Sequence, residues 1–217
     1  MKKFFYGCLM LSAILSIVLT LPGCNLVNIK TSEKSQAVIE IPNGWLQLKT
    51  DDFSIYLPDG WKGGSAQEFA SIVNEQFEIT PTETTNSDNK PLLVFWAYDT
   101  ASASEDASTT FNILKVTSDI SSLKDYTDKS YKNIEAASKE LDSNYKVVEQ
   151  QILKMGSYGQ VARSITSQEL LGNNIKIAQY IIKDGTIFWI MTFSAAQKDF
   201  DASINNFDKA IQTTAFK

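Results

Sequence analysis

The feature that most constrains the fold is an apolar strand segment near the end of the chain, residues 187–193. Successive side chains of a strand point to opposite faces of its sheet. Trp189 and Met191 therefore face one way, while Phe188 and Ile190 face the other. Apolar burial is worth about 25 cal/mol per Å², so neither face is left in water at low cost. The segment predicts a sheet that is covered on both faces.

The segment is the last member of a predicted four-strand meander with short connections. Asp184-Gly185 is the strongest turn signal, because a type I′ turn requires positive φ at both central positions. Earlier segments that alternate in polarity or are wholly apolar predict further strands. The predicted strands are residues 45–48, 53–57, 92–98, 111–116, 145–153, 158–166, 175–182 and 186–194.

Three segments carry apolar residues at spacings of three and four, which is typical of amphipathic helices. Capping boxes open the first two, Ser65 with Glu68 and Ser122 with Asp125. The third lies at the end of the chain, where Phe200, Ile204, Phe207 and Ile211 share one face. We therefore expect an α+β fold, an α/β/α sandwich whose antiparallel central sheet carries helices on both faces.

Two stretches resemble the PsbP-like superfamily, which includes a photosystem II subunit and many bacterial lipoproteins. They are residues 53–61, and residues 185–195 followed by the helix with Phe200 and Phe207. The resemblance covers residues 45–217 and implies an antiparallel sheet flanked by helices, in proteins that dock onto assemblies rather than catalyse. The photosynthetic subfamily has been linked to manganese or calcium handling. Because this chain has no histidine, we assign no metal ligand and no cofactor.

The N-terminal residues have the pattern of an export signal. Two lysines precede an apolar run over residues 4–21, and a small residue, Gly23, follows shortly after it. We predict a signal peptide over residues 1–23. The alternative is an uncleaved transmembrane anchor, since roughly 18 apolar residues just span a bilayer. A short run that ends in a small residue favours cleavage.

The string Leu21-Pro22-Gly23-Cys24 resembles the bacterial lipobox. Gly23 leaves the peptide bond before Cys24 open to the signal peptidase, and the Cys24 thiol is the nucleophile that accepts a diacylglyceryl group. One acyl chain binds a membrane reversibly, whereas the two or three chains of a lipoprotein, palmitate among them, make release negligible. We therefore expect a protein that is lipid-anchored to the cell membrane on its extracytoplasmic side.

The predicted organisation is a lipidated cysteine with a flexible tether over residues 24–42 and one PsbP-like globular domain over residues 43–217. Cys8 leaves with the signal and Cys24 is acylated, so no thiol remains for a disulfide. Loss of two lysines takes the formal net charge from −5 to −7. That charge disfavours nucleic acid as a partner.

The missing residue types exclude most catalytic sites. Without histidine or a mature free thiol, the chain cannot form Ser-His-Asp, Cys-His or typical zinc arrangements. We assign no catalytic residue. The glycine-rich residues 60–64 lack phosphate-loop spacing and are expected to connect a strand to a helix. Turn and cap roles are expected for the carboxylate pairs Asp51-Asp52, Glu105-Asp106 and Asp199 with Asp201.

Three side chains are candidate binding residues. Arg163, the only arginine, either anchors an acidic ligand or closes an ion pair with a neighbour such as Glu149, and we favour the ion pair. Trp45 and Trp61 lie near turns and are either exposed binding aromatics or part of the core. Trp96 and Trp189 belong to dense apolar strands and are expected in the core.

Two functional hypotheses follow. The favoured one is a non-enzymatic lipoprotein module that binds an unknown envelope protein or helps an assembly form. The alternative is a small-ligand receptor or a carboxylate-based hydrolase with an acidic cleft, which requires two converging carboxylates. A pocket lined by Trp45, Trp61 and Arg163 would favour ligand binding.

Overall fold

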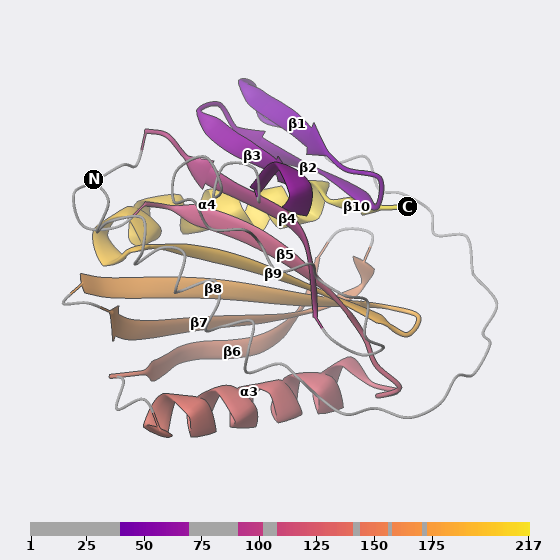
Figure 1. Ribbon diagram of the computed structural model, residues 1–217, viewed down its shortest axis with the longest axis vertical. Coiled ribbons are helices and arrows are strands. Elements are labelled where there is room, and N and C mark those ends of the chain that lie inside the picture. The colour runs from indigo at the N-terminus through magenta and orange to yellow at the C-terminus, as the bar shows by residue number, and fades with distance from the viewer. Residues whose placement is uncertain (1–39, 70–90, 102–107, 141–143, 156–157, 171–172) are drawn as a thin grey trace.

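A computed structural model describes residues 40–69, 91–101, 108–140, 144–155, 158–170 and 173–217 (Figure 1). The predicted signal peptide, Cys24 and nearly all of the predicted tether lie outside the described residues. In the described ranges, no helix combines the length and the apolar character needed to cross a membrane.

A seven-stranded antiparallel sheet dominates the fold, with strand order β3-β4-β5-β9-β8-β7-β6. In that order its strands are β3 (Trp61–Ser65), β4 (Leu92–Asp99), β5 (Thr110–Thr117), β9 (Ile187–Ala196), β8 (Asn173–Asp184), β7 (Gln160–Leu170) and β6 (Lys146–Lys154). The predicted four-strand meander is confirmed. It consists of β6, β7, β8 and β9, and strands that follow one another in the chain are adjacent in the sheet.

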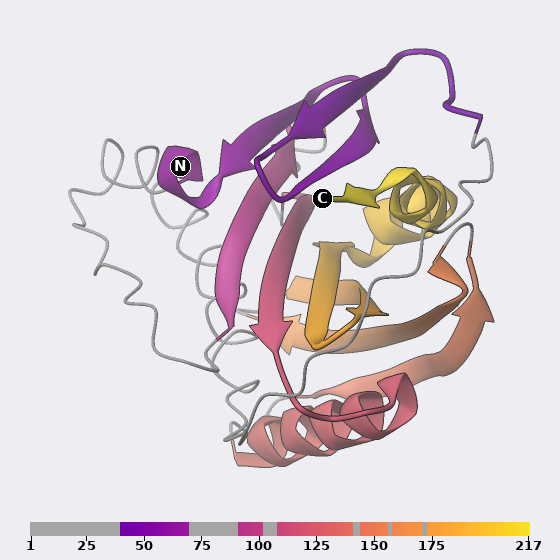
Figure 2. The same ribbon diagram turned by 90° about the vertical axis from the view of Figure 1, so that its right-hand side faces the viewer.

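A second antiparallel sheet, which the predicted sandwich lacks, contains β1 (Trp45–Lys49), β2 (Phe53–Pro58) and β10 (Ala215–Phe216) in the order β1-β2-β10. Its hairpin is the predicted pair of strands over residues 45–57. The last residues of the chain complete the sheet, because Phe216 lies opposite Phe53 in the register. Figure 2 shows that the N- and C-terminal parts of the described chain thus meet on one side of the molecule.

Two long helices pack on the large sheet. Helix α3 (Leu123–Glu140) contacts β7 and β8, and its Tyr126 ring stacks on Phe188 with 3.8 Å between centroids. Helix α4 (Gln197–Thr213) contacts β2, β8 and β9, and its Phe207 ring stacks on Phe193 at 4.1 Å. Phe188 and Phe193 are an odd number of residues apart in β9, so their side chains lie on opposite faces of the sheet.

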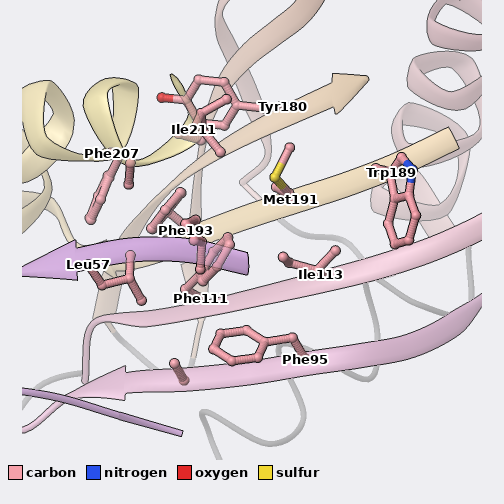
Figure 3. Close-up of a cluster of buried hydrophobic side chains, with 14 of the residues drawn as sticks. Leu57, Phe95, Phe111, Ile113, Tyr180, Trp189, Met191, Phe193, Phe207 and Ile211 are labelled. Carbon is pink, nitrogen blue, oxygen red and sulfur yellow. The ribbon is translucent and has the colours of Figure 1, made fainter. Parts of the chain in front are cut away.

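The larger core lies between the two sheets and α4 (Figure 3). Phe193 is at its centre, where its ring stacks on Phe111 at 4.2 Å and on Phe207. Leu57 from β2 and Ile211 from α4 close the cluster and are fully buried. Trp96 and Trp189 are buried as expected.

The glycine-rich residues 60–64 do not form the expected connector. Residues 61–64 instead form most of strand β3, in which Gly63 lies opposite Ala97 of β4. A Cβ atom on Gly63 would stand 2.1 Å from the carbonyl oxygen of Trp96, so only glycine fits this close approach. The predicted Ser65–Glu68 capping box is present, and residues 66–69 after it are helical; the rest of the predicted helix lies outside the described residues.

Candidate functional site

The main charged cluster among the described residues is built around Arg163 on β7. Its guanidinium Nη1 atom lies 2.5 Å from Oε1 of Glu149 on β6, and its Nε atom lies 3.2 Å from Oδ1 of Asp208 on α4. Residue Arg163 is only 8% exposed, whereas both carboxylates remain in partial contact with solvent. The favoured ion pair with Glu149 is therefore present, and Asp208 is a partner that the sequence did not predict.

Tyr180 on β8 completes the Arg163 cluster. Its hydroxyl donates a hydrogen bond of 2.7 Å to Oδ1 of Asp208, and the Arg163 guanidinium lies 6.0 Å from its ring centroid. Burial raises the pKa of Tyr180 well above its ordinary value, and the negative charge of Asp208 raises it further. Tyr180 is thus a neutral donor that holds Asp208 in place.

The charges of the Arg163 cluster are satisfied within it. Burial alone would lower the pKa of Arg163, but its hydrogen bond with Tyr180 and the charges of Asp208 and Glu149 together raise it. Two carboxylates pair with the guanidinium, and Nη1 donates to Glu149, while the buried Nε atom lies near Asp208 without a hydrogen bond. Glu149 and Asp208 thus share one cation. The cluster therefore joins β6, β7, β8 and α4.

The two candidate tryptophans lie in different surroundings. Trp61 is 8% exposed and packs edge-to-face against Phe193 and Phe207, with centroid distances of 6.3 and 6.5 Å. It belongs to the core, so the interpretation as an exposed binding aromatic is wrong for this residue. β3 places the indole there, since its pairing with β4 turns Trp61 inward. Trp45 is partly buried and packs against the same core from β1.

A row of buried polar side chains crosses the face of the sheet on which α3 packs. Asn112, Thr192, Gln179 and Ser164 lie directly opposite one another on β5, β9, β8 and β7. The amide nitrogen of Gln179 donates to Thr192, while its Oε1 atom is buried without a hydrogen-bond partner. Sequence reasoning missed this row, because each strand contributes only one residue to it and only the strand register brings the four together.

Strand β6 is one of the two edge strands of the large sheet, and three of its aliphatic side chains are exposed. Val147, Val148 and Ile152 are 48%, 57% and 43% exposed, and they make up three of the five large hydrophobic side chains that are exposed in the described residues. A register shift between Val147 and Glu149 marks a β-bulge. Sequence reasoning predicted the strand but not its place at the edge.

Some of the other described acidic residues pair with lysines. Within the described ranges, no group of three or more acidic or cysteine side chains converges on one point. Asp52 pairs with Lys115 at 2.9 Å, and Asp201 pairs with Lys176 at 2.7 Å. The pair Glu105-Asp106 lies outside the described residues.

The structure is similar to solved PsbP-like structures. The solution structure of cyanobacterial PsbP from Synechocystis sp. PCC 6803 matches with a TM-score of 0.55 and 11% identity, over 91% of this chain and 99% of that one. This likeness establishes a PsbP-like fold.

Two weaker matches come from other bacteria. A Pseudomonas aeruginosa protein of unknown function, described as a putative regulator, matches with a TM-score of 0.48 and 11% identity, over 81% of this chain and 99% of that one. LpqN, described as involved in cell envelope biogenesis of Mycobacterium tuberculosis, matches with a TM-score of 0.43 and 13% identity, over 80% of this chain and 90% of that one. No family model and no curated relative matches the sequence.

Proposed function

We propose that the chain is a lipid-anchored, extracytoplasmic binding module that attaches to the membrane through acylated Cys24 and docks onto another protein of the envelope. The proposal combines an anchor predicted from the sequence with a PsbP-like fold. The globular domain works through a surface, without catalysis and without a bound cofactor.

The observation that carries the binding role is the concentration of exposed aliphatic side chains on β6. A sheet edge with unpaired backbone groups is a template for another strand, and soluble proteins commonly protect such edges. Exposed aliphatic side chains that gather on one strand favour an interaction site more than scattered single residues do. A binding role also suits an arginine cluster whose charges are already paired.

Membrane anchoring is tested by the mass and location of the full chain expressed in bacteria. The wild-type chain should remain in the membrane fraction after high-salt washing, and its mass should correspond to a chain that begins at Cys24 and carries acyl groups. Cys24→Ser should retain residues 1–23 and gain no acyl mass. Cys8→Ser is the matched control, because Cys8 is removed with the signal, and its mature form should be identical to wild type. A wild-type chain with an unmodified Cys24 would refute the anchor.

A further inference from the structure

We propose that the open edge of β6 binds an extended segment of a different protein, one whose aliphatic centre is flanked by acidic residues, and that this segment adds to the large sheet as an eighth strand. The inference rests on the proposed function, because it names the surface and the kind of partner through which the module binds.

The backbone of β6 supplies the first argument. β6 is the terminal strand of the sheet order, and in the described chain it pairs only with β7. It has nine residues, so its free side extends for roughly 30 Å at about 3.3 Å per residue. The N–H and C=O groups on that side can hydrogen-bond an added strand, which is how peptides bind open sheet edges in β-augmentation.

The opposite edge of the sheet offers no equivalent template. β3 has five residues, two of which are glycines without side chains to contact a partner. β6 instead presents Val147 and Ile152 toward the α3 side of the sheet, opposite Thr166 and Ala162 of β7. Val148 is at the bulge and is the most exposed of the large hydrophobic residues that the structure describes. These side chains give an added strand apolar surface to cover.

The charges of β6 indicate that the added strand carries acidic residues. Glu149 already pairs with Arg163. The charges of β6 that can contact an added strand are therefore those of Lys146 and Lys154, which are exposed at its two ends. Opposite charges across paired strands contribute about 0.2–1 kcal/mol each, and like charges disfavour pairing by similar amounts. A segment with acidic residues at both ends and aliphatic residues between them is therefore the best match.

The same residues disfavour a second copy of this chain. An antiparallel pair of β6 strands centred on Gln150 would place Lys146 opposite Lys154 twice. A pair centred on Glu149 would place the two Glu149 carboxylates opposite each other. Terminal lysines and a bulge are devices by which natural edges avoid self-association. Here they disfavour the chain's own strand and leave the aliphatic centre of β6 available to a segment with acidic ends.

A lipid surface is also a poorer occupant than a strand. Lipid could cover Val148 and Ile152, but acyl chains offer no hydrogen bonds to the outward backbone groups of β6. An added strand satisfies the backbone and the side chains together, so the partner that the geometry favours is a peptide segment.

Two synthetic peptides of about ten residues test the proposal with the full-length chain in detergent. Both have the same alternating valine and threonine centre, and they differ only in carrying aspartate or lysine at both ends. At low salt the aspartate peptide should bind at least about tenfold more tightly and should slow hydrogen exchange of β6 amides. Val148→Asp should weaken that binding about tenfold or more, whereas Val148→Thr should retain most of it.

Leu46→Asp is the matched control, because Leu46 is 51% exposed on β1, at an edge of the other sheet. It should leave the affinity for the aspartate peptide unchanged. Equal affinity for both peptides, protection of β1 instead of β6, or protection of β6 by dimerisation or anionic vesicles without peptide would overturn the proposal. None of these results depends on the mass of the acylated N-terminus, so failure here is distinguishable from failure of the proposed anchor.

Discussion

The Nη1 atom of Arg163 lies 2.5 Å from the Oε1 atom of Glu149, so the guanidinium ties the edge strand β6 to β7. Through Nε the same side chain reaches Asp208, and it thereby also ties the sheet to α4. The edge strand and α4 are thus both linked to β7 through one cation.

Replacing Arg163 by methionine should lower the free energy of unfolding by roughly 2–4 kcal/mol. Two carboxylates would lose the cation between them, and breaking a buried pair by removing one partner is strongly destabilising. Because Glu149 and Asp208 are partly exposed, we expect the lower part of that range. Adding Asp208→Asn to Arg163→Met should recover part of the loss, as measured by urea unfolding. A loss below about 0.5 kcal/mol would mean that the pairs behave as ordinary surface salt bridges.

Gly63→Ala should destabilise the protein by roughly 2–3 kcal/mol, because the added methyl group would collide with the backbone of Trp96 and force β3 away from β4. Gly44→Ala is the control, since Gly44 has a φ of +80° and no atom lies within 4 Å of the position that an added methyl group would take. It should cost only about 1 kcal/mol, the conformational penalty alone. Similar losses for both variants in urea unfolding would refute the close approach of β3 and β4.

Trp61→Ala should cost about 3–5 kcal/mol, as expected for removal of a large aromatic side chain from a core. Trp45→Ala should cost less, because Trp45 is only partly buried against that core. Thermal or urea unfolding of the two variants measures the difference. If Trp61→Ala were nearly neutral, the indole would not be packed between Phe193 and Phe207.

Alkaline pH should destabilise the fold partly through Tyr126. Burial raises the pKa of Tyr126 to about 12, whereas an unfolded tyrosine titrates near pH 10. Its contribution is fully present below about pH 10 and is lost as the pH rises through about 12, because the unfolded chain releases its proton first. Tyr126→Phe should therefore show a shallower fall in unfolding free energy over that range. An identical pH dependence in wild type and variant would contradict this assignment.

Much of the fold could be predicted from the sequence because its signals are local. Polarity and turn residues located the meander, and the Ser65–Glu68 capping box appears with the predicted hydrogen bonds. The Arg163–Glu149 pair was also accessible, since a short connection brings β6 beside β7. Each of these features depends on residues close together in the chain.

The features that were missed depend on contacts between distant segments. Glycine is disfavoured in strands, so nothing local predicts β3; its pairing with β4 exists because Gly63 permits a close approach. β10 has only two residues and is held by β2 and by stacking of Phe216 on Trp189 at 4.4 Å. Asp208 meets Arg163 because of how α4 lies across the sheet, an angle that helical periodicity does not encode.

Site-specific photo-cross-linking in intact cells tests the central claim, that the anchored domain binds a protein through β6, most directly. A photoreactive side chain would replace Val148 in one full-length chain and Leu46 in another. The account predicts one discrete adduct from position 148 whose cross-linked segment is aliphatic with acidic flanks, no such adduct from position 46, and loss of the adduct when Cys24→Ser is added. No adduct from position 148, or the same adducts from both positions, would contradict it.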